Sequence, residues 1–279
     1  MTDHPRIPLA GVIGSPIAHS RSPRLMRHWL ERYGIAGHYI PMDVAQADLR
    51  EVLATLPKAG FVGCNVTIPH KESVLAIADI VSDRAALIGA ANTLIFLGDG
   101  RIHADNTDGV GFLASLRQGA PDWNAGAGPA AVFGAGGAAR AVIAALMDAG
   151  VPEIRLANRT RARAETLRQE FGAKIQVCDW VQAADMLKGA ATVVNTTALG
   201  MKGRPDLELP FDALDPSAIV TDLVYTPLRT AFLDAAEARG CLTVDGLGML
   251  LHQAVPGFER WFGQRPEVDD IARSAALGA

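Results

Sequence analysis

The chain has 279 residues, of which 49% are hydrophobic and 20% are charged, and its formal net charge is -4. A hydrophobic fraction near the globular average, with so little net charge, excludes a disordered chain. The slight acidic excess speaks against a nucleic-acid-binding or membrane-surface protein, because either would need clustered Lys and Arg. At this length we expect two domains or one large one.

The three cysteines are spread along the chain at Cys64, Cys178 and Cys241. This odd, widely spaced set predicts neither a disulfide framework nor a zinc site, and the seven histidines are scattered too, so we expect no bound metal. The N-terminal residues lack the apolar stretch of a secretory signal peptide. We therefore expect a cytoplasmic protein without a membrane partner.

Short apolar runs alternate with helical patterns in the first part of the chain. Ser22-Pro23 predicts a helix start, since serine is a favoured N-cap and proline a favoured first helical residue. Gly98-Asp99-Gly100 predicts the turn of a hairpin. The pattern predicts strands at 9–13, 38–44, 60–66, 92–96 and 102–104, and helices from Ser22 onward and over 47–56.

A turn-rich stretch at 118–129 separates this part from a second one with a regular strand–helix rhythm. Strands that alternate with helices predict a parallel, doubly wound sheet with right-handed crossovers. The predicted elements are strands at 130–133, 153–157, 174–177, 191–195 and 218–223, and helices at 137–149 and 161–171.

A glycine-rich turn, Gly134 to Ala139, follows the first of these strands and opens a helix. It matches G-x-G-x-x-A, in which Gly134 makes the tight turn and Gly136 lets the backbone approach a pyrophosphate. The free N–H groups at the helix start would hold the anion. A glycine-rich turn alone is also compatible with tight packing, but the strand before it and the helix after it favour a dinucleotide site.

The end of the next strand indicates which dinucleotide binds. An NAD site places a carboxylate there for the ribose 2'-hydroxyl, whereas this chain has Asn158-Arg159-Thr160-Arg161-Ala162-Arg163. Charge-assisted hydrogen bonds contribute about 1.5 to 3 kcal/mol each, so two of them on a 2'-phosphate would favour NADP over NAD. A solvated basic helix face is the alternative. Nucleic acid is not expected, since the basic cluster is confined to this turn and helix.

Small polar residues gather in four loops of the first part. Hydroxyls, amides and a carboxylate suit a polyhydroxylated ligand, which an apolar pocket would not hold. Taken singly, each loop is equally compatible with a helix cap or a turn. A calcium loop is not expected, because the 104–115 frame lacks two required carboxylates. The four loops are 20–23, 65–71, 90–93 and 105–109.

Together these segments resemble the shikimate dehydrogenase family over nearly the whole chain. The resemblance implies an oxidoreductase for the reversible, NADPH-dependent reduction of 3-dehydroshikimate to shikimate, a step of aromatic amino acid biosynthesis. It rests on Ser20-Arg21-Ser22-Pro23, Asn65-Val66-Thr67 through Lys71, Gly89 to Thr93, Asn106 to Gly109, Gly134 to Ala138, Asn158 to Thr160, Asn195 to Thr197, Asp222 to Tyr225, and Asp245 to Met249 leading to Gln253.

The same resemblance implies roles for individual residues. Lys71 and Asp108 are the implied catalytic pair: the lysine ammonium, charged at neutral pH, would polarise and protonate the substrate carbonyl oxygen, and Asp108 would orient it. A surface lysine beside a loop is the alternative for Lys71. Substrate contacts are implied for Ser20, Ser22, Thr67, Asn92, Tyr225 and Gln253. NADP contacts are implied for Gly134, Ala135, Gly136, Gly137, Ala138, Asn158, Arg159, Thr160, Arg161, Arg163, Leu223 and Gly246.

Two positions depart from the family pattern without touching an assigned residue: Ala104 stands where Gly is common, and Ala198 where Pro or Ser is frequent. We expect the departure at Ala104 to affect how the Asp108 side chain is positioned.

The implied fold is α/β with two domains and an active site in the cleft between them. Residues 1–108 form an N-terminal α/β substrate domain, 109–245 a Rossmann-type doubly wound NADP domain, and 246–279 C-terminal helices that pack back on the substrate domain. Two other functions stay open: a quinate/shikimate dehydrogenase with broader substrate and cofactor use, and a non-catalytic NADP-binding sensor. We expect the protein to be a monomer or a homodimer. Its expected binding partner is the small-molecule substrate, shikimate or 3-dehydroshikimate.

Overall fold

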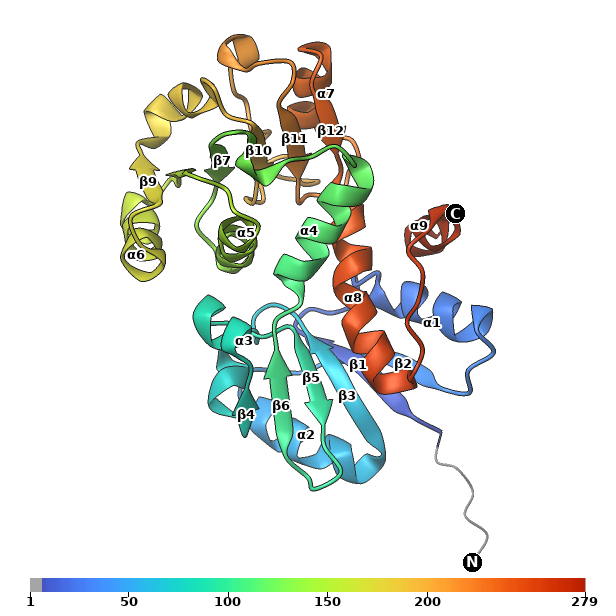
Figure 1. The fold of residues 1–279 in the computed structure, drawn as a ribbon. Helices are drawn as coiled ribbons and strands as arrows, with labels where there is room; N and C mark the ends of the chain where they lie inside the picture. The colour runs from blue at the N-terminus through green and yellow to red at the C-terminus, as the bar shows by residue number, and fades with distance from the viewer. Residues whose placement is uncertain (1–6, 279) are drawn as a thin grey trace, which may run out of the picture. The chain divides into compact units, whose positions relative to one another are not determined.

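The structure is a computed structural model that describes residues 7–278, and these form two compact units (Figure 1). The first unit takes the residues up to Thr107 and those from Gln253 onward, and the second takes Asp108–His252. The sequence places the later boundary at Gly246, but Gly246 begins helix α8 (Gly246–Phe262). This helix runs on without a break, and its Gly248 packs against Ser115 of the second unit, so the boundary falls inside the helix.

The sheet of the first unit is mixed. Its strands are β1 (Leu9–Gly14), β2 (His38–Asp43), β3 (Phe61–Val66), β4 (Ile80–Val81), β5 (Thr93–Phe96) and β6 (Ile102–Asp105). They are ordered β2-β1-β3-β5-β6-β4; β1 is parallel to both its neighbours, and β5 is antiparallel to both of its own. The β5–β6 pair confirms the predicted hairpin.

The helices of the first unit include a long one that follows β1. This helix, α1 (Ser22–Arg32), has proline in its first turn and buries Leu25, Met26, Trp29 and Leu30 as one apolar stripe. The other helical segments are α2 (Leu49–Thr55), η1 (Leu56–Ala59), η2 (Ser73–Ala76), α3 (Asp83–Ile88), the second part of α8, and α9 (Asp270–Leu277).

The C-terminal residues complete the first unit, as the fold prediction requires. The indole N–H of Trp261 donates to the Leu94 carbonyl of β5 at 3.1 Å, and that of Trp29 donates to the Glu267 carbonyl at 3.1 Å. The Arg32 guanidinium forms ion pairs with Glu267 and Asp269. The end of the chain is therefore fastened both to the sheet and to α1.

The sheet of the second unit is wholly parallel. Its strands are β7 (Ala130–Phe133), β8 (Ile154–Ala157), β9 (Ile175–Cys178), β10 (Thr192–Asn195), β11 (Ile219–Asp222) and β12 (Leu242–Val244). They are ordered β12-β11-β10-β7-β8-β9, which is the strand order of the doubly wound dinucleotide-binding fold. Successive strands are added on one side of β7 up to β9 and on its other side from β10 onward, so the strand order reverses between β7 and β10. In this fold, ligands bind at the carboxyl ends of the strands at this point.

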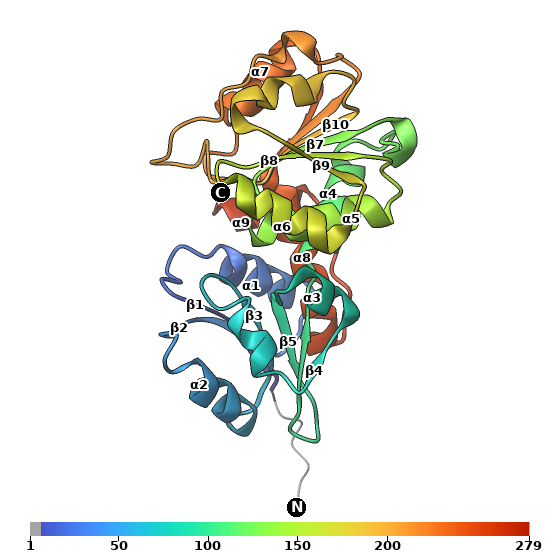
Figure 2. The same ribbon diagram turned by 90° about the vertical axis from the view of Figure 1, so that its left-hand side faces the viewer.

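Helices cover both faces of this second sheet (Figure 2). The helical segments are α4 (Asp108–Gly119), η3 (Ala125–Ala127), α5 (Gly137–Asp148), α6 (Arg161–Phe171), η4 (Trp180–Leu187), η5 (Phe211–Ala213) and α7 (Ala231–Ala238). Side chains of β7 alternate between two apolar cores: Val132 belongs to the core with α5 and α6, and Phe133 to the core with η4 and α7. This alternation explains why the strand is apolar at every residue.

Every strand predicted from the sequence is present, and each observed boundary lies within two residues of the predicted one. The helices expected after Ser22 and at 47–56, 137–149 and 161–171 are present as well. Among residues 7–278, none of the helices has both the length and the apolar character needed to cross a membrane.

Candidate active site

The glycine turn after β7 has the geometry that a dinucleotide needs. Gly134 has a φ of +108°, and a Cβ on it would lie 2.6 Å from Thr196 Oγ1, so only glycine fits there. By contrast, a Cβ on Gly136 or Gly137 would meet no atom within 4 Å. Gly136 also provides no side-chain cap for α5. The helix N-terminus therefore faces open space, into which a pyrophosphate fits.

Asn158 joins this turn to the next strand. Its Oδ1 accepts from the Ala135 backbone N–H at 3.1 Å, and its Nδ2 donates to the Thr160 carbonyl at 2.8 Å. Thr160 is the N-cap residue of α6, yet its side chain makes no capping hydrogen bond. The structure thus places Gly134, Asn158 and Thr160 together at the carboxyl ends of β7 and β8.

The three arginines of this region differ in their partners. The Arg161 guanidinium pairs with Asp179 at 2.5 Å and with Glu165 at 3.0 Å, and the hydrogen bond to Asp179 raises the pKa of Arg161. Arg159 and Arg163 are exposed and have no ion-pair partner among residues 7–278. Two unpaired cations therefore remain beside Thr160, whereas the charge of Arg161 is already balanced.

The last two residues predicted to contact the cofactor also lie together. Leu223 follows β11, and Gly246 follows β12 at the start of α8. Gly246 lies so close to the Leu223 and Val224 carbonyl oxygens that a Cβ would clash with both. Only glycine at this position allows α8 to begin against the 223–224 backbone.

A buried polar cluster occupies the first unit around Asn92, which we call the Asn92 cluster. Asn92 Oδ1 accepts from the Thr107 backbone N–H at 2.8 Å and from the Thr93 and Thr107 hydroxyls at 3.1 Å each. Its Nδ2 donates to Gln253 Oε1 at 2.8 Å, and the Thr107 hydroxyl also donates to the Gln253 carbonyl at 2.8 Å. Two residues predicted to bind the substrate, Asn92 and Gln253, are thereby brought into direct contact.

The Asn92 cluster continues through residues to which the sequence assigns no role. Asn65 Nδ2 donates to the Asn92 carbonyl at 3.1 Å, and Asn65 Oδ1 accepts from the Tyr39 hydroxyl at 2.7 Å. Burial raises the pKa of Tyr39 well above its ordinary value, and a side-chain hydrogen bond with Ser22 opposes that rise. Asn65 and Thr107 lie inside motifs noted in the sequence, but nothing local marked Tyr39.

The loop that carries Thr67 and Lys71 is fixed at both ends by backbone contacts. The Thr67 N–H donates to the Ile13 carbonyl at 2.9 Å, and the Ala91 N–H donates to the Lys71 carbonyl at 2.8 Å. Between them, His70 is fully buried and its Nε2 donates to the Val44 carbonyl at 2.7 Å. Lys71 therefore lies directly beside the strand end that carries Asn92.

The remaining predicted residues are placed as follows. Ser22 is buried in the first turn of α1, and its backbone N–H donates to Ser20 Oγ at 3.4 Å. Asp108 is 5% exposed and begins α4 immediately after Thr107 of the Asn92 cluster. Tyr225 belongs to the second unit, in the segment after β11. Since Lys71 and Asp108 belong to different units, their pairing stays a prediction.

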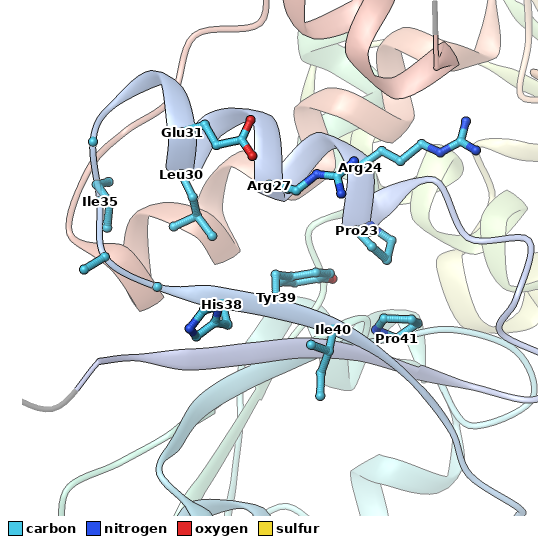
Figure 3. Close-up of a pocket in the computed structure, with 13 residues that line it drawn as sticks. Pro23, Arg24, Arg27, Leu30, Glu31, Ile35, His38, Tyr39, Ile40 and Pro41 are labelled. Carbon is cyan, nitrogen blue, oxygen red and sulfur yellow. The ribbon is translucent and has the colours of Figure 1, made fainter.

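A separate hollow of about 830 Å³ lies between α1 and β2 in the first unit (Figure 3). Its lining includes Arg24, Arg27, Glu31, Tyr39 and Ile40. None of its lining residues is one of the predicted catalytic, substrate or cofactor residues, but Tyr39 also bonds to Asn65 of the Asn92 cluster.

A doubly wound unit with an open glycine turn, alongside a mixed α/β unit with a buried amide and hydroxyl cluster, defines a nucleotide-dependent α/β oxidoreductase. Residues 12–94 match the shikimate dehydrogenase substrate binding domain, 124–200 the shikimate / quinate 5-dehydrogenase family, and 246–275 the shikimate 5'-dehydrogenase C-terminal domain. The chain belongs to the shikimate dehydrogenase family.

Individual relatives match the chain over nearly its whole length. The shikimate dehydrogenase (NADP(+)) of Cereibacter sphaeroides is 75% identical over 277 residues, which is 99% of both chains. Shikimate 5-dehydrogenase from Thermus thermophilus, solved with NADP(H) and shikimate, is 37% identical with a TM-score of 0.87, over 98% of this chain and 99% of that one. Quinate dehydrogenase from Corynebacterium glutamicum, solved with NAD, is 32% identical with a TM-score of 0.90 over the same shares.

Proposed function

We propose that this chain catalyses the reversible reduction of 3-dehydroshikimate to shikimate with NADPH, within aromatic amino acid biosynthesis. The observation that carries the proposal is the 75% identity, over 99% of both chains, to a protein named shikimate dehydrogenase (NADP(+)). The glycine turn, the open N-terminus of α5 and the unpaired arginines support it from the geometry.

NADP fits the second unit. The Gly136–Gly137 turn leaves room for the pyrophosphate, and Arg159, Thr160 and Arg163 supply two charges and a hydroxyl for the 2'-phosphate. When bound, the nicotinamide supplies or takes the hydride. Arg161, which we also assign to this region, would first have to leave Asp179 and Glu165 before it could bind a phosphate.

The chain's own residues supply the binding and the proton. Asn92, Gln253 and the hydroxyls of Ser20, Ser22, Thr67 and Tyr225 would hydrogen-bond to the carboxylate and ring hydroxyls of the substrate. Because Asn92 and Gln253 already bond to each other, the substrate would bind to an amide pair whose orientation is fixed in advance. Lys71 would hold a proton at Nζ and pass it to the oxygen at C3 as the alkoxide forms, and Asp108 would favour the charged lysine.

The steady-state rates of shikimate and quinate with NADP and with NAD test this proposal. Lys71→Ala should lower kcat at least a hundredfold and leave NADPH binding intact, because acid–base assistance contributes about 10² to 10⁴ in rate. Lys58→Ala, an exposed lysine of the same unit, is the matched control and should keep the wild-type rate. Wild-type turnover in Lys71→Ala would refute its catalytic role.

A second candidate is a broader enzyme that also oxidises quinate, supported by the match to the quinate dehydrogenase. Comparable kcat/KM values for quinate and shikimate, or for NAD and NADP, would favour it. No turnover of either substrate by the wild-type protein would favour a non-catalytic NADP-binding sensor.

We also propose that the enzyme is cytoplasmic, binds no nucleic acid, and is a monomer or a homodimer. Cell fractionation and the molar mass in solution test the first and last of these statements. Recovery of activity in the membrane fraction, or a tetrameric mass, would contradict them.

A further inference from the structure

A carboxylate is buried at the carboxyl end of β11 in the second unit. Asp222 is fully buried, and its oxygens accept three hydrogen bonds. Oδ1 accepts from Asn195 Nδ2 and from the Val224 backbone N–H, both at 2.9 Å, and Oδ2 accepts from the Thr230 hydroxyl at 2.7 Å. We call Asp222, Asn195, Thr197 and Thr230 the Asp222 cluster.

The groups that face this carboxylate are neutral donors. Among residues 7–278, no cationic side chain bonds to Asp222. Burial raises the pKa of Asp222 from 3.8 to about 6, although the bonds from Val224, Thr230 and Asn195 lower it. A buried charge with no opposite charge opposes folding, whereas an amide of the same shape would not. Packing alone therefore does not explain why a carboxylate occupies position 222.

One side of the Asp222 cluster leads to the dinucleotide turn. Asn195 Oδ1 accepts from the backbone N–H and the hydroxyl of Thr197, at 3.0 and 2.7 Å. The adjacent Thr196 hydroxyl donates to the Phe133 carbonyl at 2.7 Å. The same hydroxyl lies so close to Gly134 that a Cβ on Gly134 would clash with it. The end of β11 is thus linked through the end of β10 to the glycine turn after β7.

The other side of the cluster fixes both ends of the segment 223–229. The Val224 N–H holds the start of the segment to Asp222, and Thr230 holds its end. The Leu223 N–H also donates to the Asn195 carbonyl at 3.0 Å. This short segment carries Leu223 and Tyr225, which are the proposed contacts to NADP and to the substrate.

We propose that Asp222 is a positioning residue, which holds Leu223 and Tyr225 in register with the dinucleotide turn by bonding to both ends of their segment and to Asn195. The proposal rests on the proposed function, in which Leu223 contacts NADP and Tyr225 the substrate. A carboxylate suits this role because both its oxygens accept, and all three of its partners donate.

Asp222→Asn is the gentlest test. The amide oxygen can keep both N–H donors, but the amide nitrogen then faces the Thr230 hydroxyl, which must change from donor to acceptor. We expect kcat/KM for shikimate to fall at least tenfold, mainly through KM, while the NADPH dissociation constant changes less than threefold. The thermal midpoint should not fall, because a buried charge has been removed.

Asp215→Asn is the matched control in the same unit. Asp215 is exposed and also accepts two hydrogen bonds, from the backbone N–H and hydroxyl of Ser217 at 2.8 and 2.7 Å. Among residues 7–278, the Asp215 carboxylate makes no bond to segment 223–229, so Asp215→Asn should keep wild-type kcat and KM for both shikimate and NADPH.

Two results would overturn the positioning role. One is a wild-type kcat/KM in Asp222→Asn, and the other is a loss of activity that merely follows a fall in the thermal midpoint. If Asp222→Asn does not fold, Thr230→Val and Thr230→Ser decide: valine should lower kcat/KM at least threefold and serine should restore it, and equal values would overturn the role. A wild-type protein that does not oxidise shikimate would instead refute the proposed function.

Discussion

The two buried polar clusters use different chemistry. The Asn92 cluster of the first unit consists of amides and hydroxyls, so the cluster itself carries no charge. The Asp222 cluster of the second unit surrounds one ionisable group with neutral donors. The stability that the first cluster contributes should not change with pH near neutrality. The second cluster contains Asp222, whose pKa of about 6 means that it binds a proton just below neutral pH.

The clusters differ in how the chain builds them as well. Asn92 and Gln253 are 161 positions apart, so the first cluster forms only when distant parts of the chain meet. The second joins Asn195 and Asp222, the last residues of the neighbouring parallel strands β10 and β11, to Thr230, which lies eight positions after Asp222. The neutral Asn92 cluster therefore holds together two distant parts of the chain, whereas the Asp222 cluster, which contains an ionisable group, fixes the short segment 223–229.

Asn92→Ala should have the largest effect on stability. It leaves the buried Thr107 N–H without an acceptor and creates a cavity, so we expect the free energy of unfolding in urea to fall by about 3 kcal/mol. The loss should be equal at pH 5 and pH 8, because the cluster is neutral. Asn124→Ala, at an exposed turn where Oδ1 accepts from Gly126, should cost less than about 1 kcal/mol. A loss that varied with pH would break the contrast between the clusters.

The pH dependence of Asp222 comes next. Its pKa of about 6 in the folded protein lies above the ordinary 3.8, so its stabilising contribution is complete below pH 3.8 and is lost as the pH rises through about 6. A shift of about 2 units corresponds to about 3 kcal/mol. Relative to wild type, Asp222→Asn should therefore be more stable at pH 7.5, and urea unfolding should show that this advantage shrinks by about 2 kcal/mol at pH 4.5. An advantage that stays constant with pH would mean that Asp222 does not titrate there.

Tyr39→Phe should have the smallest effect of the three. It removes the hydroxyl that donates to Asn65 Oδ1 at 2.7 Å and that also bonds with Ser22. Both bonds are neutral, so we expect a cost of about 1 to 2 kcal/mol with no dependence on pH between 5 and 8. Tyr33→Phe is the control, because the Tyr33 hydroxyl accepts from the exposed Glu267 N–H and its loss should be too small to resolve. Equal losses in the two variants, measured by urea unfolding, would show that the Asn65 bond adds nothing.

Of the twelve strands among residues 7–278, the sequence predicted ten, together with α1, α2, α5 and α6, because the signals of these elements are local. The run Ala130–Phe133, the glycine turn and the helix after it are each defined by a few adjacent residues. The sequence did not predict β4, which has two residues, or β12 and α3, which are too short to show a periodicity. It also did not predict α4 and α7. The positions of β4 and β12 depend on pairing with β6 and β11, which lie elsewhere in the chain.

The candidate site was predictable as a set of residues but not as a set of contacts. The motifs indicated Asn92 and Gln253, yet only the folded chain shows that they bond to each other. They also included Asp222, but its burial against Asn195 and Thr230 depends on the ends of β10 and β11 and on the start of α7. Nor does the sequence reveal that Arg161 is held by Asp179, 18 positions further on, rather than free like Arg159.

Because the second unit is one continuous stretch inside the first, the two differ in when they can be completed during synthesis. The ribosome releases residues 108–252 as an unbroken run, so all six strands of the parallel sheet are present before the chain ends. The first unit must wait for its C-terminal residues, because Trp261 of α8 bonds to β5 and Glu267, between α8 and α9, bonds to α1. Since domains fold as units while the chain is being made, the nucleotide-binding half can assemble first, and the half with the Asn92 cluster closes last.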